Sequence, residues 1–527
     1  MKKKLVSLLA MALVASMAFS GCAAPQQAET DQDGGYVVET LRLAADGDWG
    51  GPNPYLHSTR GPGTQKMTLV FDSLLTAGPE GLIPWLAESY TVDDLTYTFT
   101  IHKDALWHDG QPVTTADIAF TIDYYREFMP AQDVSYTLGT GENFAIDSYE
   151  IVDDYTIKIK AAKKLASNER NIGSFPILPK HIWEKVEDPY TYNEPDAFIG
   201  CGMYKSTAYD AATGSYEFEA FDQYYGHQQA ARYVRFIPTS DELLAFENNE
   251  IDLADVSPDL IDKYKQDPSI KMIEKYDDFG YKLLINFDKV PELKDLEVRK
   301  ALYKALDRQA MVDSVFRGAG HVASAGHVPQ TSMFYTDEVE KYDYEPEEAK
   351  SVLEPLNLSV RLCCEESGDA ANIAQMVKLN LEAAGVKVTV DAYDTATRDA
   401  KVFDGDYELA INSHGGWNMT PDYMQTLYSD VAKGKSKSPL AATSYGYTSE
   451  ALTELAEAEA VETDFDKRVE KFQELQVQAS KEIPILPLCT QVTTSMYHPE
   501  VYDCWRKEFD FQQFNLCRIS FVVSLDD

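Results

Sequence analysis

The chain has 527 residues, of which 44% are apolar, 12% aromatic and 25% charged, so a disordered or collagen-like protein is excluded. The length suffices for two or three domains, each with its own core. Asp and Glu number 86 against 47 for Lys and Arg, and the formal net charge of -39 excludes a nucleic-acid partner, which requires a positively charged surface.

The first 22 residues have the pattern of an export signal. Three lysines precede an apolar run from Leu5 to Phe19, which is too short for a membrane-spanning helix. The run ends at Ser20-Gly21-Cys22, which resembles the lipobox of bacterial lipoproteins. We expect Cys22 to carry a lipid anchor that is the only membrane attachment, and residues 23–36 to form a flexible tether.

Strands and one capped helix are expected early in the folded body. Residues 37–44 and 96–101 alternate between apolar and polar side chains, as half-buried strands do. Thr114 and Asp117 have the spacing of a capping box, and apolar residues at helical intervals follow them. The sequence therefore predicts a strand followed by a helix that starts near residue 115.

Helices and buried strands alternate farther along the chain. The expected helices are residues 240–250, 295–316 and 370–384. The expected strands are residues 281–287, 386–390 and 407–412. This alternation predicts an α/β lobe with mixed or parallel strand pairing.

No motif of a catalytic centre is found. Residues 318–323 match G-x-G-x-x-A, but they follow an expected helix where a dinucleotide-binding turn must follow a strand, so we predict a loop. His321 and His327 are six residues apart, unlike a helical metal-binding pair, and are predicted to lie at the surface. We expect no metal and no cofactor, and an extracellular hydrolase remains the competing class of protein.

The cysteines outside the leader form no C-x-x-C pair and therefore no zinc framework. They are Cys201, Cys363, Cys364, Cys489, Cys504 and Cys517. A disulfide between Cys504 and Cys517 and a set of free buried thiols are both open alternatives.

The most specific signal lies in residues 70–124. Its ordered parts are residues 71–75 (FDSLL), 86–89 (LAES), the strand at 96–101, 107–112 (WHDGQP) and 116–117 (AD). Further matching segments are residues 53–55 (NPY), 178–181 (LPKH), 202–204 (GMY), 298–302 (VRKAL) and 483–488 (IPILPL). This set resembles the family 5 extracellular solute-binding proteins, the peptide/nickel class of receptors for ABC importers.

The resemblance implies an α/β fold of two lobes joined by two crossover strands. This is the type II periplasmic-binding-protein-like architecture, in the large class with an extra subdomain in the first lobe. By analogy, the first lobe comprises residues 37–65, 195–275 and 490–527, with the subdomain inserted at 66–194. The second lobe comprises residues 276–489.

The resemblance also implies a receptor that is not an enzyme. It captures an oligopeptide or dipeptide by hinge closure and delivers it to the permease and ATPase subunits of an ABC importer. We expect a monomer on the outer side of the cell membrane, at a cell surface or in a periplasm. The alternative within the family is a receptor for nickel or another metal chelate.

Residues 414–423 correspond to the segment that binds the ligand in the peptide receptors of the family. There, an Asp three residues after a Trp holds the ammonium group of the peptide, whose burial without a carboxylate would be costly. Here Thr420 occupies that position after Trp417, and Asp422 follows two residues later. Asp422 is therefore the first candidate for an ammonium ligand, although its position differs from the family pattern.

The remaining candidates have both a binding and a structural interpretation. Trp417 is expected to line the cleft or to pack within the lobe. His414 is expected to bind a chelated metal or a carboxylate, or to be a hydrogen-bonded loop residue. Arg398 is expected to pair with a ligand carboxylate or with a surface Asp.

Three aromatic residues complete the candidates. Trp49 and Tyr55, in a first-lobe loop, are expected either to face Trp417 across the cleft or to pack in the core. Tyr423 is a further candidate for the cleft.

Overall fold

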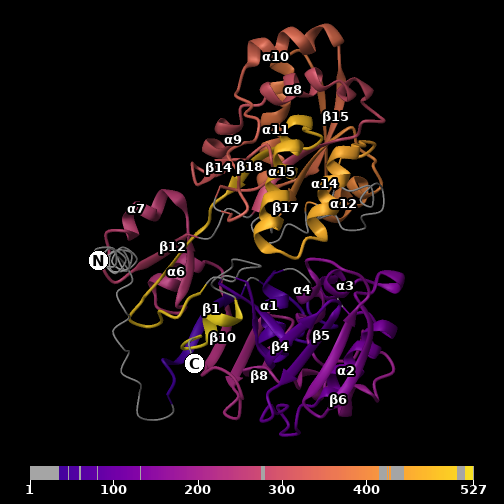
Figure 1. Ribbon diagram of the computed structural model, residues 1–527. Coiled ribbons are helices and arrows are strands. Elements are labelled where there is room, and N and C mark those ends of the chain that lie inside the picture. The colour runs from indigo at the N-terminus through magenta and orange to yellow at the C-terminus, as the bar shows by residue number, and fades with distance from the viewer. Residues whose placement is uncertain are drawn as a thin grey trace, which may run out of the picture.

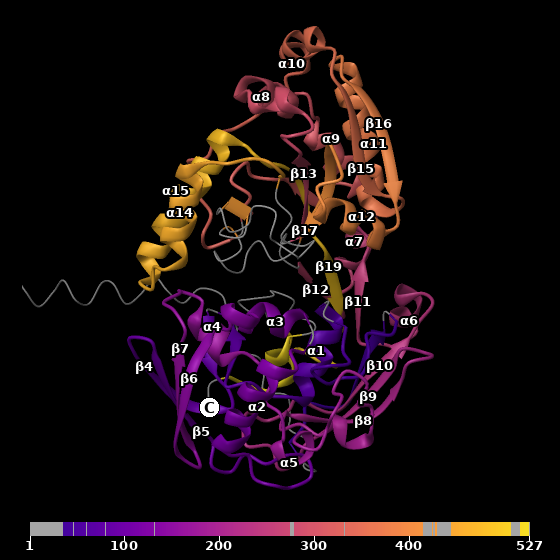
Figure 2. The same ribbon diagram turned by 90° about the vertical axis from the view of Figure 1, so that its right-hand side faces the viewer.

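The computed structural model shows a two-lobed α/β protein (Figures 1 and 2). It describes residues 35–45, 47–58, 61–79, 81–130, 132–274, 279–330, 332–414, 424, 427–428, 444–506 and 517–525. No helix in this part of the chain is both long enough and apolar enough to cross a membrane.

The first lobe contains a four-stranded sheet in the order β1-β10-β9-β8. Its strands are β1 (Val38–Ala45), β10 (Ala231–Pro238), β9 (Ser215–Ala220) and β8 (Tyr204–Asp210). β1 runs parallel to β10, and the other pairs are antiparallel. The helix α1 (Gly61–Val70) contacts β8 beside this sheet, and α6 (Glu242–Glu247) and α7 (Ile261–Tyr264) follow β10.

Residues 75–161 contribute a hairpin and a second, antiparallel sheet to the same lobe. The hairpin is β2 (Leu75–Gly78) and β3 (Gly81–Pro84), and the sheet has the order β4-β5-β7-β6. Its strands are β4 (Ala87–Asp93), β5 (Thr96–Ile101), β7 (Thr156–Ala161) and β6 (Ile146–Asp153). The accompanying helices are α2 (Thr115–Glu127), α3 (Gln132–Leu138), α4 (Asn168–Gly173) and α5 (Lys180–Trp183). One hydrophobic cluster joins both sheets into a single core.

The local patterns explain these early elements. Along β5, Tyr97, Phe99 and Ile101 are buried in alternation with partly exposed threonines, as predicted for this strand. The predicted capping box is present at α2, where the Thr114 amide donates to Asp117 Oδ2 at 2.8 Å. The strand and the helix start are therefore both confirmed.

The second lobe contains a six-stranded sheet in the order β14-β18-β13-β17-β15-β16. Its strands are β14 (Gly320–Val322), β18 (Leu486–Gln491), β13 (Phe279–Ile285), β17 (Leu409–His414), β15 (Ser359–Glu365) and β16 (Lys387–Tyr393). β15 is parallel to both β16 and β17, whereas β13 is antiparallel to its two neighbours. The mixed sheet predicted for this half of the chain is confirmed.

Helices cover both faces of this sheet. A cluster on one face includes residues of α8 (Leu296–Lys304), α9 (Arg308–Val315), α10 (Pro346–Leu353) and α11 (Gly368–Ala383). A cluster on the other face includes residues of α12 (Thr395–Phe403), α14 (Glu450–Ala460) and α15 (Phe465–Glu482). The sheet is thus the central layer of the lobe.

A three-stranded antiparallel sheet lies where the two lobes meet. It has the order β11-β19-β12, with strands β11 (Leu253–Val256), β19 (Thr494–Tyr497) and β12 (Lys271–Glu274). β19 follows β18 of the second lobe after only two residues. The chain therefore passes directly from the large sheet into this small one (Figure 2).

The prediction of one helix over residues 295–316 is wrong. The structure has two helices, α8 and α9, because Asp307 caps a new helix with its Oδ1 atom, which accepts from the Ala310 amide at 2.9 Å. The apolar periodicity continues across this break and conceals it.

Two predictions around residue 320 are also wrong. Within the expected loop, Gly320–Val322 form the edge strand β14, which pairs with β18. His321 is exposed, as predicted, but His327 is buried with 4% of its surface exposed. The spacing of the two histidines excludes a helical metal pair but carries no information on burial.

The six cysteines of the body are all buried and free. Cys517 does not pair with Cys504, and its Sγ atom lies 2.9 Å from Ser520 Oγ and contacts the Arg506 carbonyl oxygen. The free-thiol alternative is the one that the structure shows.

A buried polar network joins the C-terminal segment to Asp72, which lies between α1 and β2. Asp72 is fully buried and accepts hydrogen bonds from Trp85 Nε1 at 3.0 Å, Tyr224 Oη at 3.0 Å and Tyr225 Oη at 2.6 Å. Arg518 Nη1 lies 3.5 Å from its Oδ1 atom. Burial raises the pKa of Asp72, while Arg518 and the three donors oppose this rise.

We expect Asp72→Ala to lower the free energy of unfolding by about 3 kcal/mol or more, because it leaves the buried Arg518 without this carboxylate. Urea denaturation measures the change. The exposed Asp104→Ala variant is the control and is expected to stay within about 0.5 kcal/mol of wild type. A similar midpoint for both variants would contradict the structural role of the network.

Candidate functional site

The region between the lobes is where a ligand site is expected from the sheet geometry. β18 runs from the second lobe directly into β19 and is parallel to β17 and β15, so the carboxyl ends of these three strands point toward the first lobe. Ligands bind at the carboxyl ends of strands in open α/β sheets. This edge of the large sheet therefore faces the expected cleft.

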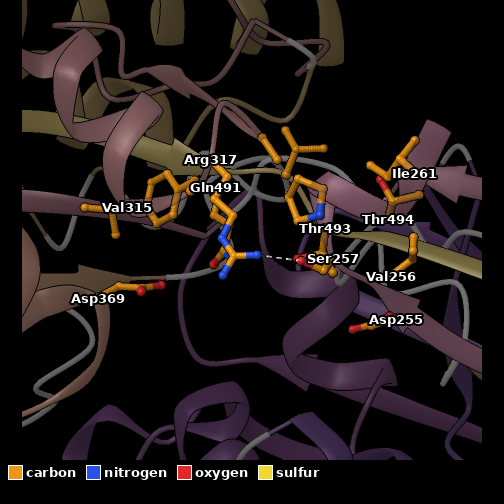
Figure 3. Close-up of a pocket in the computed structure, with 14 residues that line it drawn as sticks. Asp255, Val256, Ser257, Ile261, Val315, Arg317, Asp369, Gln491, Thr493 and Thr494 are labelled. Carbon is orange, nitrogen blue, oxygen red and sulfur yellow. Dashed lines mark hydrogen bonds between the residues drawn. The ribbon is translucent and has the colours of Figure 1, made fainter. Parts of the chain in front are cut away.

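A cavity of about 290 Å³ lies beside the chain crossover (Figure 3). Its walls come from residues 255–258 and 261 of the first lobe, residues 315–317, 319 and 369 of the second lobe, and residues 491–494 between them. Because both lobes contribute, the shape of this cavity depends on the angle between them.

Arg317 bridges the two lobes at this cavity. Its backbone has φ of +54°, and its Nη1 atom donates to Asp259 Oδ1 at 2.5 Å and to Ser257 Oγ at 3.1 Å. The hydrogen bonds from Ser257 and Arg317 hold the pKa of Asp259 at about 2. Both charged side chains are more than half exposed, so salt screens their attraction. The ion pair therefore contributes little to the stability of the fold, and its main effect is on the relative orientation of the two lobes.

Trp49 lies in a tightly folded loop of the first lobe. Its backbone amide donates to Tyr216 Oη at 2.8 Å, and its carbonyl accepts from the Ser58 amide at 2.7 Å. The indole Nε1 atom is buried and makes no hydrogen bond to any residue that the structure describes. Because its ring packs against the first-lobe core and its Nε1 atom is buried, the contacts of Trp49 support the packing interpretation.

Tyr55 occupies a buried aromatic cluster. Its ring stacks on Trp183 with centroids 5.3 Å apart and meets Tyr124 and Tyr190 edge-on. Its hydroxyl donates to the Phe128 carbonyl at 2.7 Å, and burial raises its pKa. Of the two interpretations for Tyr55, packing in the core is the one that these contacts support.

Arg398 is buried inside the second lobe. It forms ion pairs with Glu365 and, at 3.1 Å, with Asp399. The side-chain amide of Asn412 is oriented so that its oxygen and its nitrogen both form hydrogen bonds, and Asn412 Oδ1 then accepts from Arg398 Nη1 at 2.8 Å. Arg398 therefore pairs with acidic residues of its own lobe and joins α12 to the ends of β15 and β17.

Sequence reasoning missed a second buried cation, Lys282. It lies on β13 opposite Asn412, and its side chain is fully buried. Burial lowers the pKa of Lys282 to about 7, and burial together with the Lys282 charge holds the pKa of His327 well below its usual value. The signal was a lysine inside the apolar run of residues 281–287.

Lys282, Asn412 and Arg398 form a polar row on the face of the sheet that bears α12, α14 and α15. The row lies next to His414, whose backbone ends β17 and pairs with Gly280. Polar side chains near the carboxyl end of β17 are where the fold predicts ligand contacts.

Four predicted residues fall outside the described part of the chain. They are Cys22, Trp417, Asp422 and Tyr423. The side chain of His414 is likewise not described. Within the described ranges, no group of three or more His, Cys, Asp and Glu side chains could hold a metal ion.

Comparison with known proteins identifies the family. A sequence model of the bacterial extracellular solute-binding proteins, family 5 (middle region), matches residues 81–436, which is more than half of the chain. The chain belongs to this family. The resemblance found in the sequence is thereby confirmed, and the protein is a solute-binding transport component that acts outside the cytoplasm rather than an enzyme.

Individual relatives extend over most of the chain. The dipeptide-binding protein of Escherichia coli K12 is 26% identical over 509 residues, which cover 89% of this chain and 91% of that protein. The structure of NikA from Brucella suis in complex with Fe(III)-EDTA matches with a TM-score of 0.75 at 20% identity, over 90% of this chain and 98% of that one. The putative peptide-binding protein AppA from Clostridium difficile matches with a TM-score of 0.74 at 20% identity, over 87% and 95% of the two chains. These structures confirm the two-lobed fold.

Lys282→Met is expected to change how stability depends on pH. The unfolded chain keeps a proton on Lys282 up to about pH 10.4, whereas the folded chain releases it near pH 7. This side chain therefore makes the free energy of unfolding rise with pH between these values. Without it, the variant should be more stable than wild type by a few kcal/mol near about pH 6.5, and the advantage should shrink toward about pH 9.5.

Urea denaturation at several pH values measures this difference. Lys289→Met, at an exposed lysine paired with Asp406, is the control and should follow the wild-type curve. A Lys282→Met curve parallel to wild type over the same range would show that the buried lysine does not titrate there.

Proposed function

We propose that the protein is the substrate-binding component of an ABC importer and that its ligand is a dipeptide or oligopeptide. The observation that carries this proposal is the similarity to the Escherichia coli dipeptide-binding protein along nearly the whole length of both chains. A relation over this length includes both lobes and the crossover between them, which a cleft receptor needs.

The ligand acts by closing the lobes around itself. It can shift the balance between open and closed forms only by its different affinity for the two, and about 5.5 kcal/mol converts a 1:99 mixture into 99:1. The crossover at residues 491–494 and the cavity shared by both lobes support a hinge there. The closed form is the one presented to the permease, and the ATPase subunits of the importer supply the energy of transport.

The proposed receptor is attached to the membrane by a lipid and is divided into two lobes. Cys22 carries the lipid that tethers a monomeric receptor to the outer side of the membrane. The first lobe comprises residues 37–65, 195–275 and 490–527 with residues 66–194 inserted, and the second lobe comprises residues 276–489.

Asp422 holds the ammonium group of the peptide in place of the Asp that the family pattern expects at position 420. Trp417 forms an aromatic wall of the cleft, with Tyr423 beside Asp422. These roles follow the order of residues in the segment 414–423, where the chain leaves β17 at the edge of the sheet that faces the first lobe.

Identification of the co-purifying ligand tests the function. The purified protein is denatured, and the released small molecules and metals are identified by mass spectrometry. A mixture of short peptides is the expected result.

Calorimetric titration with peptides and with N-acetylated versions then tests the ammonium site, because acetylation removes the charge that Asp422 is proposed to bind. Equal affinities for both forms would contradict that site.

Trp417→Ala is expected to weaken peptide binding at least tenfold, since aromatic residues dominate the energy of such contacts. The melting temperature without ligand should change little. Calorimetry and thermal melting measure the two quantities, and Trp505→Ala is the control, because that tryptophan is buried and meets Tyr502 edge-on. Unchanged affinity in Trp417→Ala would remove Trp417 from the site.

A metal chelate is the second candidate ligand. Thr420 in place of the expected Asp and the position of His414 at the end of β17 favour it. Stoichiometric nickel or another metal with a small carboxylate chelator in the purified protein would support this candidate over the peptide.

A further inference from the structure

The described residues make a direct contact between the lobes far from the crossover. The Ala166 amide of the first lobe donates a hydrogen bond to the Ala460 carbonyl of the second lobe at 2.8 Å. Ala166 lies between β7 and α4, and Ala460 is the last residue of α14. In Figure 2, the lower ends of α14 and α15 approach α4 on the side away from β11, β12 and β19. The two lobes are thus in contact at both ends of their interface.

The first-lobe half of this contact is held in shape by its own loop. Asn168 is buried, and its Nδ2 atom donates to the Lys163 carbonyl at 2.9 Å. Its backbone amide donates to the Leu165 carbonyl at 3.2 Å. The loop that presents the Ala166 amide is therefore fixed by residues of the first lobe alone.

The second-lobe side of this contact is likewise fixed by residues of its own lobe. Glu459 is fully buried and pairs with Arg468 Nε at 2.6 Å, which joins the end of α14 to α15. The Glu462 amide also donates to the Glu459 carbonyl at 3.1 Å. Ala460 is itself buried, and its carbonyl lies at the helix end, where the backbone dipoles place partial negative charge. Two preformed surfaces therefore meet without rearrangement.

Charge on the two sides is complementary. Lys163 and Lys164 are exposed in the first-lobe loop. Residues 450–464, which form α14 and the following turn, contain five glutamates and one aspartate. Glu459, Glu462 and Asp464 pair with basic residues of α15, whereas Glu450, Glu454 and Glu457 are exposed. Opposite charges across the gap favour approach of the lobes, and salt weakens this attraction beyond about 8 Å.

We propose that Ala166 and Ala460 form a clasp that holds the lobes closed from the side opposite the crossover. It rests on the hinge closure proposed above and adds a contact that no ligand needs to touch. Loss of one net hydrogen bond of this kind should lower the ratio of closed to open protein roughly fivefold. The apparent affinity for any ligand that binds the closed form should fall with that population.

The clasp is tested without ligand by the distance between spin labels on the two lobes. Cysteines at Val152 and Leu379, which are 48% and 65% exposed, carry the labels, whereas the six cysteines of the body are buried. Ala166→Pro removes the donor amide, and Ala166→Ser keeps it as a matched control. We expect a shorter distance in wild type and Ala166→Ser, and a shift toward longer distances in Ala166→Pro with an unchanged near-ultraviolet circular dichroism spectrum. Equal distributions in all three proteins, or a wild type found only in the open form, would overturn the clasp.

A charge variant tests the same contact without touching the backbone. Lys163→Glu with Lys164→Glu should shift the distances in the same direction at low salt, and the shift should shrink at about 0.5 M salt. Lys103→Glu with Lys185→Glu is the control, since the interactions of both lysines lie within the first lobe. An equal shift in the control pair would overturn the role of charge at the clasp.

Addition of a peptide separates this proposal from the function. A wild-type distance that does not change with any co-purifying ligand would count against ligand-driven closure. The comparison of Ala166→Pro with Ala166→Ser in the absence of ligand would still decide the clasp.

Discussion

Where the chain crosses from the second lobe to the first, it forms a sheet strand on each side of the crossing. This pairing limits how the lobes can move relative to each other. β18 is paired on both sides in the six-stranded sheet, and β19 is the central strand of the three-stranded sheet. Only residues 492–493 separate them. Because ladder hydrogen bonds fix the strands themselves, the proposed change in the angle between the lobes would be absorbed in this short segment. The cavity beside Arg317 lies at that place and changes shape with the angle.

Each lobe contains a buried polar network that joins segments distant in the sequence. In the first lobe, Asp72 accepts three hydrogen bonds and pairs with the Arg518 guanidinium, so segments at opposite ends of the chain are joined. In the second lobe, Arg398 joins α12 to Glu365 and Asn412. Buried polar groups are costly unless they are paired, so these networks favour one arrangement of each lobe. The proposed motion is then concentrated between the lobes, where Arg317 pairs with Asp259 and the Ala166 amide donates to the Ala460 carbonyl.

Local sequence patterns predicted the elements whose formation depends on nearby residues. The alternation in β5 and the capping box of α2 act over a few residues, so both could be read directly. The start of α9 at Asp307 was missed because apolar spacing continues through the break. β14 was missed because three residues carry no pattern of their own and become a strand only beside β18. His327 was predicted to lie at the surface but is buried. The sequence missed this because burial depends on the packing of the whole lobe.

The sequence alone determined the family and the α/β class, because ordered motifs along the chain carry this information without coordinates. It also led to the proposal that residues 414–423 bind the ligand. It also indicated Arg398 as a residue of interest, but only the tertiary structure decided that its guanidinium pairs with Glu365 and Asp399 inside the lobe. The same holds for Tyr55, whose partners lie between 69 and 135 residues away along the chain. The contact between Ala166 and Ala460 joins two alanines that no motif distinguishes, and only the packing of the two lobes brings them together. Contacts of this kind depend on the relative position of distant segments, which local residue patterns do not encode.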